Sequence, residues 1–121
     1  MDHEPGLCAT YLAAMDVLAK PWNGLIIALL EEGPLRFSEL SARLPGIGDR
    51  MLAARLKELG VRGLVTRNVE PGPPVRVGYS LTDVGRGFRD VAGAIRHWGE
   101  TLLAAQERPA PKRGSRVRRS G

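Results

Sequence analysis

With 121 residues, 43% of them hydrophobic and 26% charged, the chain has the length and composition of one small globular domain. Its longest apolar run, Leu25–Leu30, has six residues, whereas a bilayer span needs about 20. The acidic N-terminus differs from a signal peptide, and the single Cys8 excludes an internal disulfide and a cysteine-rich zinc site. We expect a cytoplasmic protein with no membrane segment, cofactor or metal, and the lack of a catalytic motif disfavours an enzyme.

The net charge of +5 is concentrated in two segments. Residues 36–76 carry eight basic and four acidic residues, and the flanking parts of residues 1–107 are net negative. The six charged residues after Glu107 are all basic. This distribution predicts an anionic partner for the middle segment. We interpret residues 1–107 as one folded domain and residues 108–121 as a disordered basic tail.

The first part of the chain has the apolar spacing of amphipathic helices. Helices are predicted over residues 8–19, 22–32 and 37–44. Pro21 separates the first two, because the residue before a proline disfavours helical backbone. The predicted inward stripe of the second helix consists of Trp22, Leu25, Ile26, Leu29 and Leu30.

A fourth helix is predicted over residues 49–62, four residues after the breaker Pro45-Gly46. Leu52, Leu56 and Leu59 form its inward stripe. The opposite face carries Arg50, Ala54, Lys57 and Val61, with Ala53 at its edge.

Two strands and a long helix complete the predicted order. Leu64–Glu70 and the alternating segment Val75–Leu81 are strand candidates joined by a proline-rich tip. Thr82 is the expected N-cap of the last helix. Apolar residues then recur in a heptad pattern that favours dimerisation, at Val84, Phe88, Val91, Ile95, Trp98, Leu102 and Ala105.

Helix, helix, short helix, turn, helix, β-hairpin and helix is the order of a winged helix-turn-helix, a mostly α fold with a small β-hairpin. Helix 49–62 is then the recognition helix, which enters the major groove of double-stranded DNA. Arg50 suits a guanine edge, and the alanine methyl groups suit thymine methyls. The predicted DNA contacts are Arg36, Ser38, Arg43, Arg50, Ala53, Ala54, Lys57 and Arg76. The alternative is that this basic face is only a solvated surface.

Several short motifs in this order resemble the HxlR family of bacterial transcriptional regulators. They are Lys20–Trp22, Arg36–Leu40, Pro45–Ile47, Leu56–Leu59, Gly63–Val65, Pro73–Val75 and Tyr79–Gly85. The resemblance implies a DNA-binding homodimer whose first and last helices form the interface. The residues expected at that interface are Leu12, Met15, Phe88, Val91, Ile95, Trp98 and Leu102. A two-fold dimer then binds an inverted repeat.

The chain departs from the family pattern at Gly48, Ala53 and Gly60, where the family usually has a serine cap, a hydroxyl residue and a glutamate. Cys8 matches a cysteine that many members carry before the first helix, and the resemblance implies sensing of oxidants or electrophiles there. A helix N-terminus favours the reactive thiolate. The alternative is a small residue buried at the interface.

A second class of function remains open. The same fold serves as a module for RNA or protein interaction without a specific operator. The low aromatic content, 5%, disfavours single-stranded RNA, whose bases stack on aromatic side chains.

Overall fold

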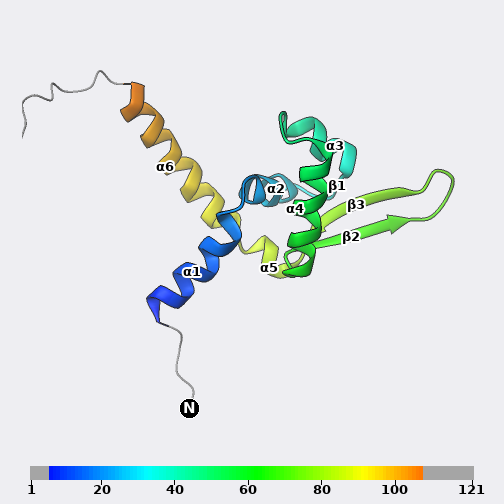
Figure 1. Ribbon diagram of the computed structural model, residues 1–121, viewed down its shortest axis with the longest axis horizontal. Coiled ribbons are helices and arrows are strands. Elements are labelled where there is room, and N and C mark those ends of the chain that lie inside the picture. Colours follow the sequence, from blue (N-terminus) through cyan, green and yellow to red (C-terminus); the bar gives the residue numbers. More distant parts are fainter. Residues whose placement is uncertain (1–5, 108–121) are drawn as a thin grey trace, which may run out of the picture. The chain divides into compact units, whose positions relative to one another are not determined.

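The computed structural model describes residues 6–107, which form six helices and three strands (Figure 1). The chain divides into two units, Met1–Arg89 and Asp90–Gly121. The second unit is described only as far as residue 107, so the predicted basic tail lies outside the described residues. Within residues 6–107, no single helix is long and apolar enough to cross a membrane.

The first two helices are α1 (Leu7–Leu18) and α2 (Asn23–Leu30), which meet at a bend of 85° around Pro21. In α2 the buried apolar residues are Ile26, Ile27 and Leu30. The prediction that Leu25 faces inward is wrong, because its side chain is 55% exposed. The segment is apolar at six consecutive positions, so its periodicity contains no polar face that would fix the orientation of the helix.

A three-stranded antiparallel sheet, in the order β1-β3-β2, contacts α2 through its central strand. β2 (Val65–Glu70) and β3 (Arg76–Leu81) pair along their whole length and form the predicted hairpin. β1 (Leu35–Arg36) pairs with β3 and is absent from the sequence prediction, since two residues are too few for a period-two pattern.

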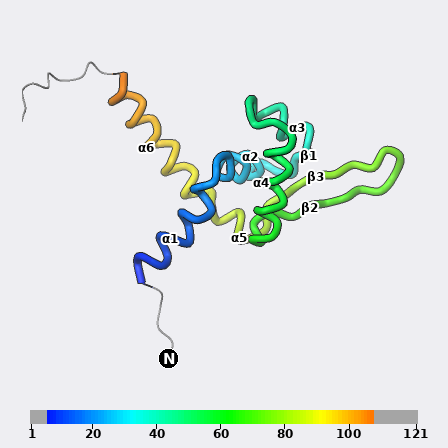
Figure 2. Tube along the Cα trace, viewed as in Figure 1, coloured from blue at the N-terminus to red at the C-terminus, as the bar shows by residue number. Residues whose placement is uncertain are grey.

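The remaining helices of the first half are α3 (Phe37–Arg43) and α4 (Asp49–Val61), close to the predicted ranges. They enclose the core with α2 and the inner face of the sheet. The buried apolar side chains are Ile26, Ile27, Leu30, Leu40, Leu44, Ile47, Leu52, Leu56, Leu59, Val65, Tyr79 and Leu81. A short helix, a turn and a second helix followed by a projecting hairpin (Figure 2) make this a winged helix-turn-helix.

The last predicted helix is interrupted. Thr82 is its N-cap as predicted, and its hydroxyl accepts a hydrogen bond from the Gly85 N–H at 3.1 Å. However, α5 (Asp83–Arg86) stops after four residues, and α6 (Arg89–Glu107) starts after Gly87 and Phe88. Two glycines within three residues weaken the helix here. The prediction of one continuous seam is therefore wrong at its start, and Phe88 packs half-buried against the core.

Gly85 allows α5 to lie directly on the backbone that precedes β2. A Cβ atom at this position would overlap the Leu64 carbonyl oxygen, and it would lie 3.1 Å from a methyl group of Leu81. Backbone cannot move aside as a flexible side chain can. The fold therefore requires glycine at position 85, because a larger side chain would collide with the backbone of Leu64.

We predict that Gly85→Ala lowers the free energy of unfolding by about 1–3 kcal/mol, the usual cost of overpacking. Urea unfolding followed by circular dichroism measures the change. Gly93→Ala in α6 is the control, because a methyl group added there would meet no atom within 4 Å beyond its chain neighbours and the backbone of its own helix, and alanine favours the helix interior. Equal stability of the two variants would show that the close approach at Gly85 is irrelevant.

Candidate nucleic-acid interface

Helix α4 has one face in the core and the other in solvent. Leu52, Leu56 and Leu59 are 0%, 3% and 0% exposed, as predicted. Each such leucine contributes roughly 1.5–3 kcal/mol of burial. Their spacing fixes the rotation of the helix about its axis. Consequently the opposite face is directed outward, and Arg50, Ala53, Ala54 and Lys57 are all exposed on it.

The turn between α3 and α4 fixes the angle at which α4 begins. The Ser41 hydroxyl donates a hydrogen bond to Asp49 Oδ1 at 3.2 Å and so joins the two helices across the turn. Ile47 in the turn is buried. Gly48 has φ +74° and ψ 144°, a region that glycine alone occupies readily. The missing serine cap therefore coincides with a backbone conformation that serine would adopt only under strain.

The basic residues of this region differ in whether they have an ionic partner. Arg55 and Arg62 are both bound to Glu58, at 2.9 and 3.3 Å. Within residues 6–107, neither Arg50 nor Lys57 takes part in an ion pair. As far as the described chain is concerned, the two cations of the exposed face are thus available to an external anion.

The start of α3 and the wing formed by β2 and β3 border a second part of this surface. Arg36 and Arg76, both predicted DNA contacts, line a groove of about 550 Å³ there. Glu39 and Glu70 line it as well. Glu39 accepts a hydrogen bond from the Arg36 backbone N–H at 2.8 Å, which supports the N-terminus of α3. The other two predicted contacts, Ser38 and Arg43, are exposed on α3.

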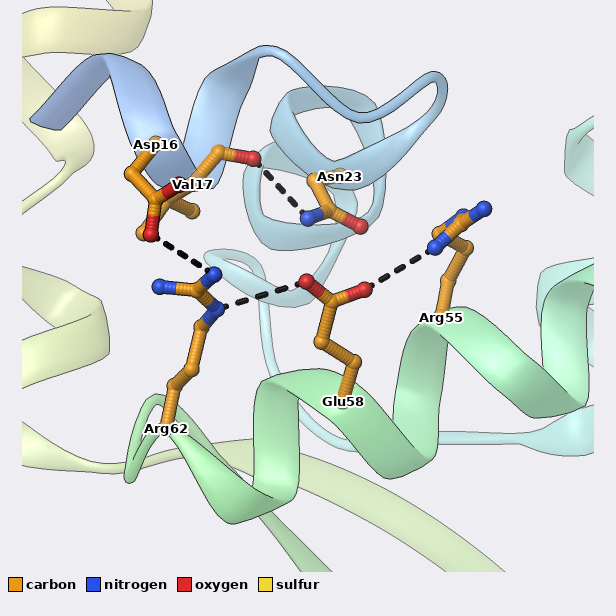
Figure 3. Close-up of polar contacts among 6 residues, drawn as sticks. All are labelled: Asp16, Val17, Asn23, Arg55, Glu58 and Arg62. Atoms are coloured by element: carbon orange, nitrogen blue, oxygen red, sulfur yellow. Dashed lines mark hydrogen bonds and ion pairs between the residues drawn. The ribbon is translucent and has the colours of Figure 1, made fainter.

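Behind the exposed face, a polar network joins α4 to α1 (Figure 3). Arg62, next to the end of α4, binds Asp16 of α1 at 2.9 Å and Glu58 at 3.3 Å. The hydrogen bond from Arg62 to Asp16 is the main cause of a raised pKa of Arg62. Glu58 and Arg62 have the i, i+4 spacing of neighbours on a helix, whereas Asp16 is 46 residues from Arg62 and no local sequence pattern connects the two.

The predicted interface residues are largely exposed. Cys8 lies in the first turn of α1 and is exposed, and Leu12 and Met15 follow at helical spacing with 64% and 38% exposure. In α6, the four residues predicted at the interface are between 40% and 64% exposed; they are Val91, Ile95, Trp98 and Leu102. Both helices thus carry an apolar stripe that is not buried within its own unit.

The model of the HxlR-like helix-turn-helix family matches residues 17–107. The chain belongs to the HxlR family. Two similar proteins come from Bacillus subtilis. YvaP, an HTH-type transcriptional regulator, is 45% identical over 92 residues, covering 76% of this chain and 85% of YvaP. The transcriptional regulator YodB is 42% identical over 94 residues, covering 78% and 84% of the two chains.

Two solved structures are similar to this HxlR protein. The reduced form of YodB has a TM-score of 0.70 and 41% identity, covering 78% of this chain and 93% of YodB. The redox regulator HypR in its reduced form has a TM-score of 0.76 and 33% identity, covering 81% and 97%. The chain is accordingly a transcriptional regulator of the helix-turn-helix type with a winged-helix fold.

Proposed function

We propose that the protein is a homodimer that binds an inverted repeat in double-stranded DNA through the exposed face of α4. The observation that carries the proposal is this face, on which Arg50 and Lys57 flank two alanines while three leucines anchor the other side. An arginine binds the guanine edge through two hydrogen bonds, and alanine methyl groups fit against thymine methyls.

The supporting contacts come from α3 and the wing. Arg36, Ser38 and Arg43 are exposed near the N-terminal side of the helix-turn-helix, and Arg76 lies at the start of β3 beside the hairpin tip. Phosphate contacts of this kind fix the register of a protein on the duplex without reading its sequence. Glu39 and Glu70 in the same groove limit how closely a phosphate approaches its floor.

The apolar stripes of α1 and α6 support a dimer. Leu12, Ile95 and Trp98 are each at least 46% exposed, and exposed apolar patches of this kind commonly mark protein interfaces. A second copy of the chain supplies the same apolar surface by symmetry. The two copies of α4 would then meet half-sites about one DNA turn, or ~34 Å, apart.

The aromatic residues disfavour a module for single-stranded RNA. Trp22, Phe37, Tyr79 and Phe88 are wholly or partly buried in the first unit. The exposed aromatic residues are Tyr11 and Trp98, on α1 and α6. The exposed face of α4 therefore offers no aromatic ring on which an unpaired base could stack.

Arg50→Ala and Lys57→Ala are expected to weaken binding to a selected operator by about 1–3 kcal/mol for each lost base contact. Binding to random duplex should change less, so the preference between the two duplexes narrows. The operator is first selected from a random duplex library, and affinities are then measured by fluorescence anisotropy. Lys20→Ala is the charge-matched control outside α3, α4 and the wing. Equal losses on both duplexes would mean that the two residues touch phosphates only.

Deleting residues 108–121 is expected to weaken binding to every duplex and to leave the sequence preference intact. Each phosphate contact that the tail makes contributes about 0.9 to the slope of log affinity against log salt. The slope should therefore become shallower for the truncated chain, measured on operator and random DNA alike. A changed base preference would contradict a nonspecific role.

Cys8 is proposed to make DNA binding responsive to oxidants. Two relatives, YodB and HypR, are known in reduced forms, and HypR is a redox regulator. Because the chain has one cysteine, a disulfide must join two protomers. In this reaction the Cys8 thiols of two protomers form an S–S bond and lose two protons and two electrons. These reduce one molecule of hydrogen peroxide to two molecules of water.

For this proposal, hydrogen peroxide should change the operator affinity of the wild type and leave that of Cys8→Ser unchanged. Non-reducing electrophoresis of the same samples should show a covalent dimer in the wild type alone. If both proteins bind alike with and without peroxide, Cys8 is not a sensor.

A further inference from the structure

Helix α1 is attached to the rest of its unit without a buried side chain of its own. None of its residues is buried, and Val17 packs against the core while only partly covered. A helix with so little apolar contact depends on its polar contacts for a defined direction. Within the described residues those contacts are few, and they lie near its C-terminal end.

The first contact fixes the bend after α1. The buried Asn23 side chain donates from Nδ2 to the Val17 carbonyl oxygen at 2.9 Å, and Asn23 is 0% exposed. Trp22, just before it, has φ +78°, an uncommon conformation for a residue with a side chain. The end of α1 is thereby held by a turn with an uncommon backbone conformation and one buried side-chain hydrogen bond.

The second contact joins α1 to the end of α4. Arg62 uses two different nitrogens, with Nη2 bound to Asp16 at 2.9 Å and Nε bound to Glu58 at 3.3 Å (Figure 3). Glu58 is fixed in turn by Arg55 at 2.9 Å. The planar guanidinium group thus bridges two carboxylates from two helices, a geometry that a lysine does not reproduce.

The ion pairs of Arg62 with Asp16 and Glu58 contribute more to the orientation of α1 than to the free energy of unfolding. The Asp16 side chain is 68% exposed and that of Arg62 is 30% exposed. Exposed ion pairs typically contribute little to the free energy of unfolding. Their effect on a weakly packed helix is different, because the direction of α1 has few other determinants.

We propose that Arg62 is a positioning residue that sets the angle between α1 and α4 through Asp16 and Glu58. The inference rests on the proposed function, in which α1 belongs to the dimer interface and α4 reads DNA. In such a dimer the angle between α1 and α4 determines how far apart, and in which orientation, the two recognition helices stand. Arg62 would therefore determine which spacing of half-sites the dimer accepts, without touching a base.

The test uses the full chain and a series of duplexes. A selected operator is lengthened or shortened between its half-sites by one base pair at a time, and affinities are measured for wild type, Asp16→Asn and Arg62→Gln. The ratio of the affinity at the best half-site spacing to the affinity at the neighbouring spacings should fall about two- to fivefold in both variants. This factor corresponds to the free energy of an exposed ion pair. Affinity for an isolated half-site should stay unchanged.

Asp83→Asn is the matched control, since it removes a carboxylate from the Arg86 pair of α5 and leaves α1 and α4 untouched. Amide hydrogen exchange gives a second readout without DNA. Exchange in α1 should accelerate in Asp16→Asn and Arg62→Gln, and Asp16→Glu and Asp83→Asn should behave as the wild type.

The outcomes separate the two proposals. A wild type without any preferred duplex contradicts the proposed function, and hydrogen exchange then still tests the linkage. A wild-type spacing preference that survives unchanged in both variants, with unchanged exchange in α1, contradicts the role of Arg62 alone.

Discussion

The burial of one leucine stripe on α4 is the constraint on which the rest of the surface depends. Leu52, Leu56 and Leu59 are almost wholly removed from solvent. A helix anchored at three positions along one side cannot rotate without exposing them, at a cost of several kcal/mol. The residues on the opposite side of α4 do not pack in the core, so packing does not restrict which side chains stand there. Arg50 and Lys57 stand on that side, in solvent and without an ionic partner among the described residues.

The basic residues of the middle segment, residues 36–76, divide into those that form ion pairs within the chain and those that do not. Of these basic residues, Arg55 and Arg62 are paired with Glu58 and Asp16 within the chain, and Arg43 lies 3.8 Å from Glu32. The bond from Arg62 to Asp16 joins the end of α4 to α1, and Arg55 fixes Glu58 within α4. The remaining cations face outward from α3, α4 and the wing, so one short segment supplies both the internal bracing of the fold and the external charge that an anionic partner would meet.

The sequence predicts the elements that have a strong local pattern. The α4 stripe and the Thr82 cap follow from spacing and from the chemistry of one hydroxyl group, and both are confirmed. Local sequence patterns do not predict the features that depend on tertiary contacts. Leu25 is wrongly expected to face inward, because α2 has no polar side that would fix its orientation. Strand β1 is too short to show a period-two pattern. The Asp16–Arg62 bond joins parts of the chain that are far apart in sequence. The likeness to a family helps with fold and class, but not with these contacts.

Binding of DNA by a homodimer is tested by a footprint of the full chain on its selected duplex at about 150 mM salt, close to physiological ionic strength. Binding as a homodimer predicts two protected patches of inverted sequence on one side of the duplex, with centres about one helical turn apart. It also predicts that an unrelated duplex of equal length competes poorly. Uniform protection along the DNA, with the unrelated duplex competing equally well, would contradict it.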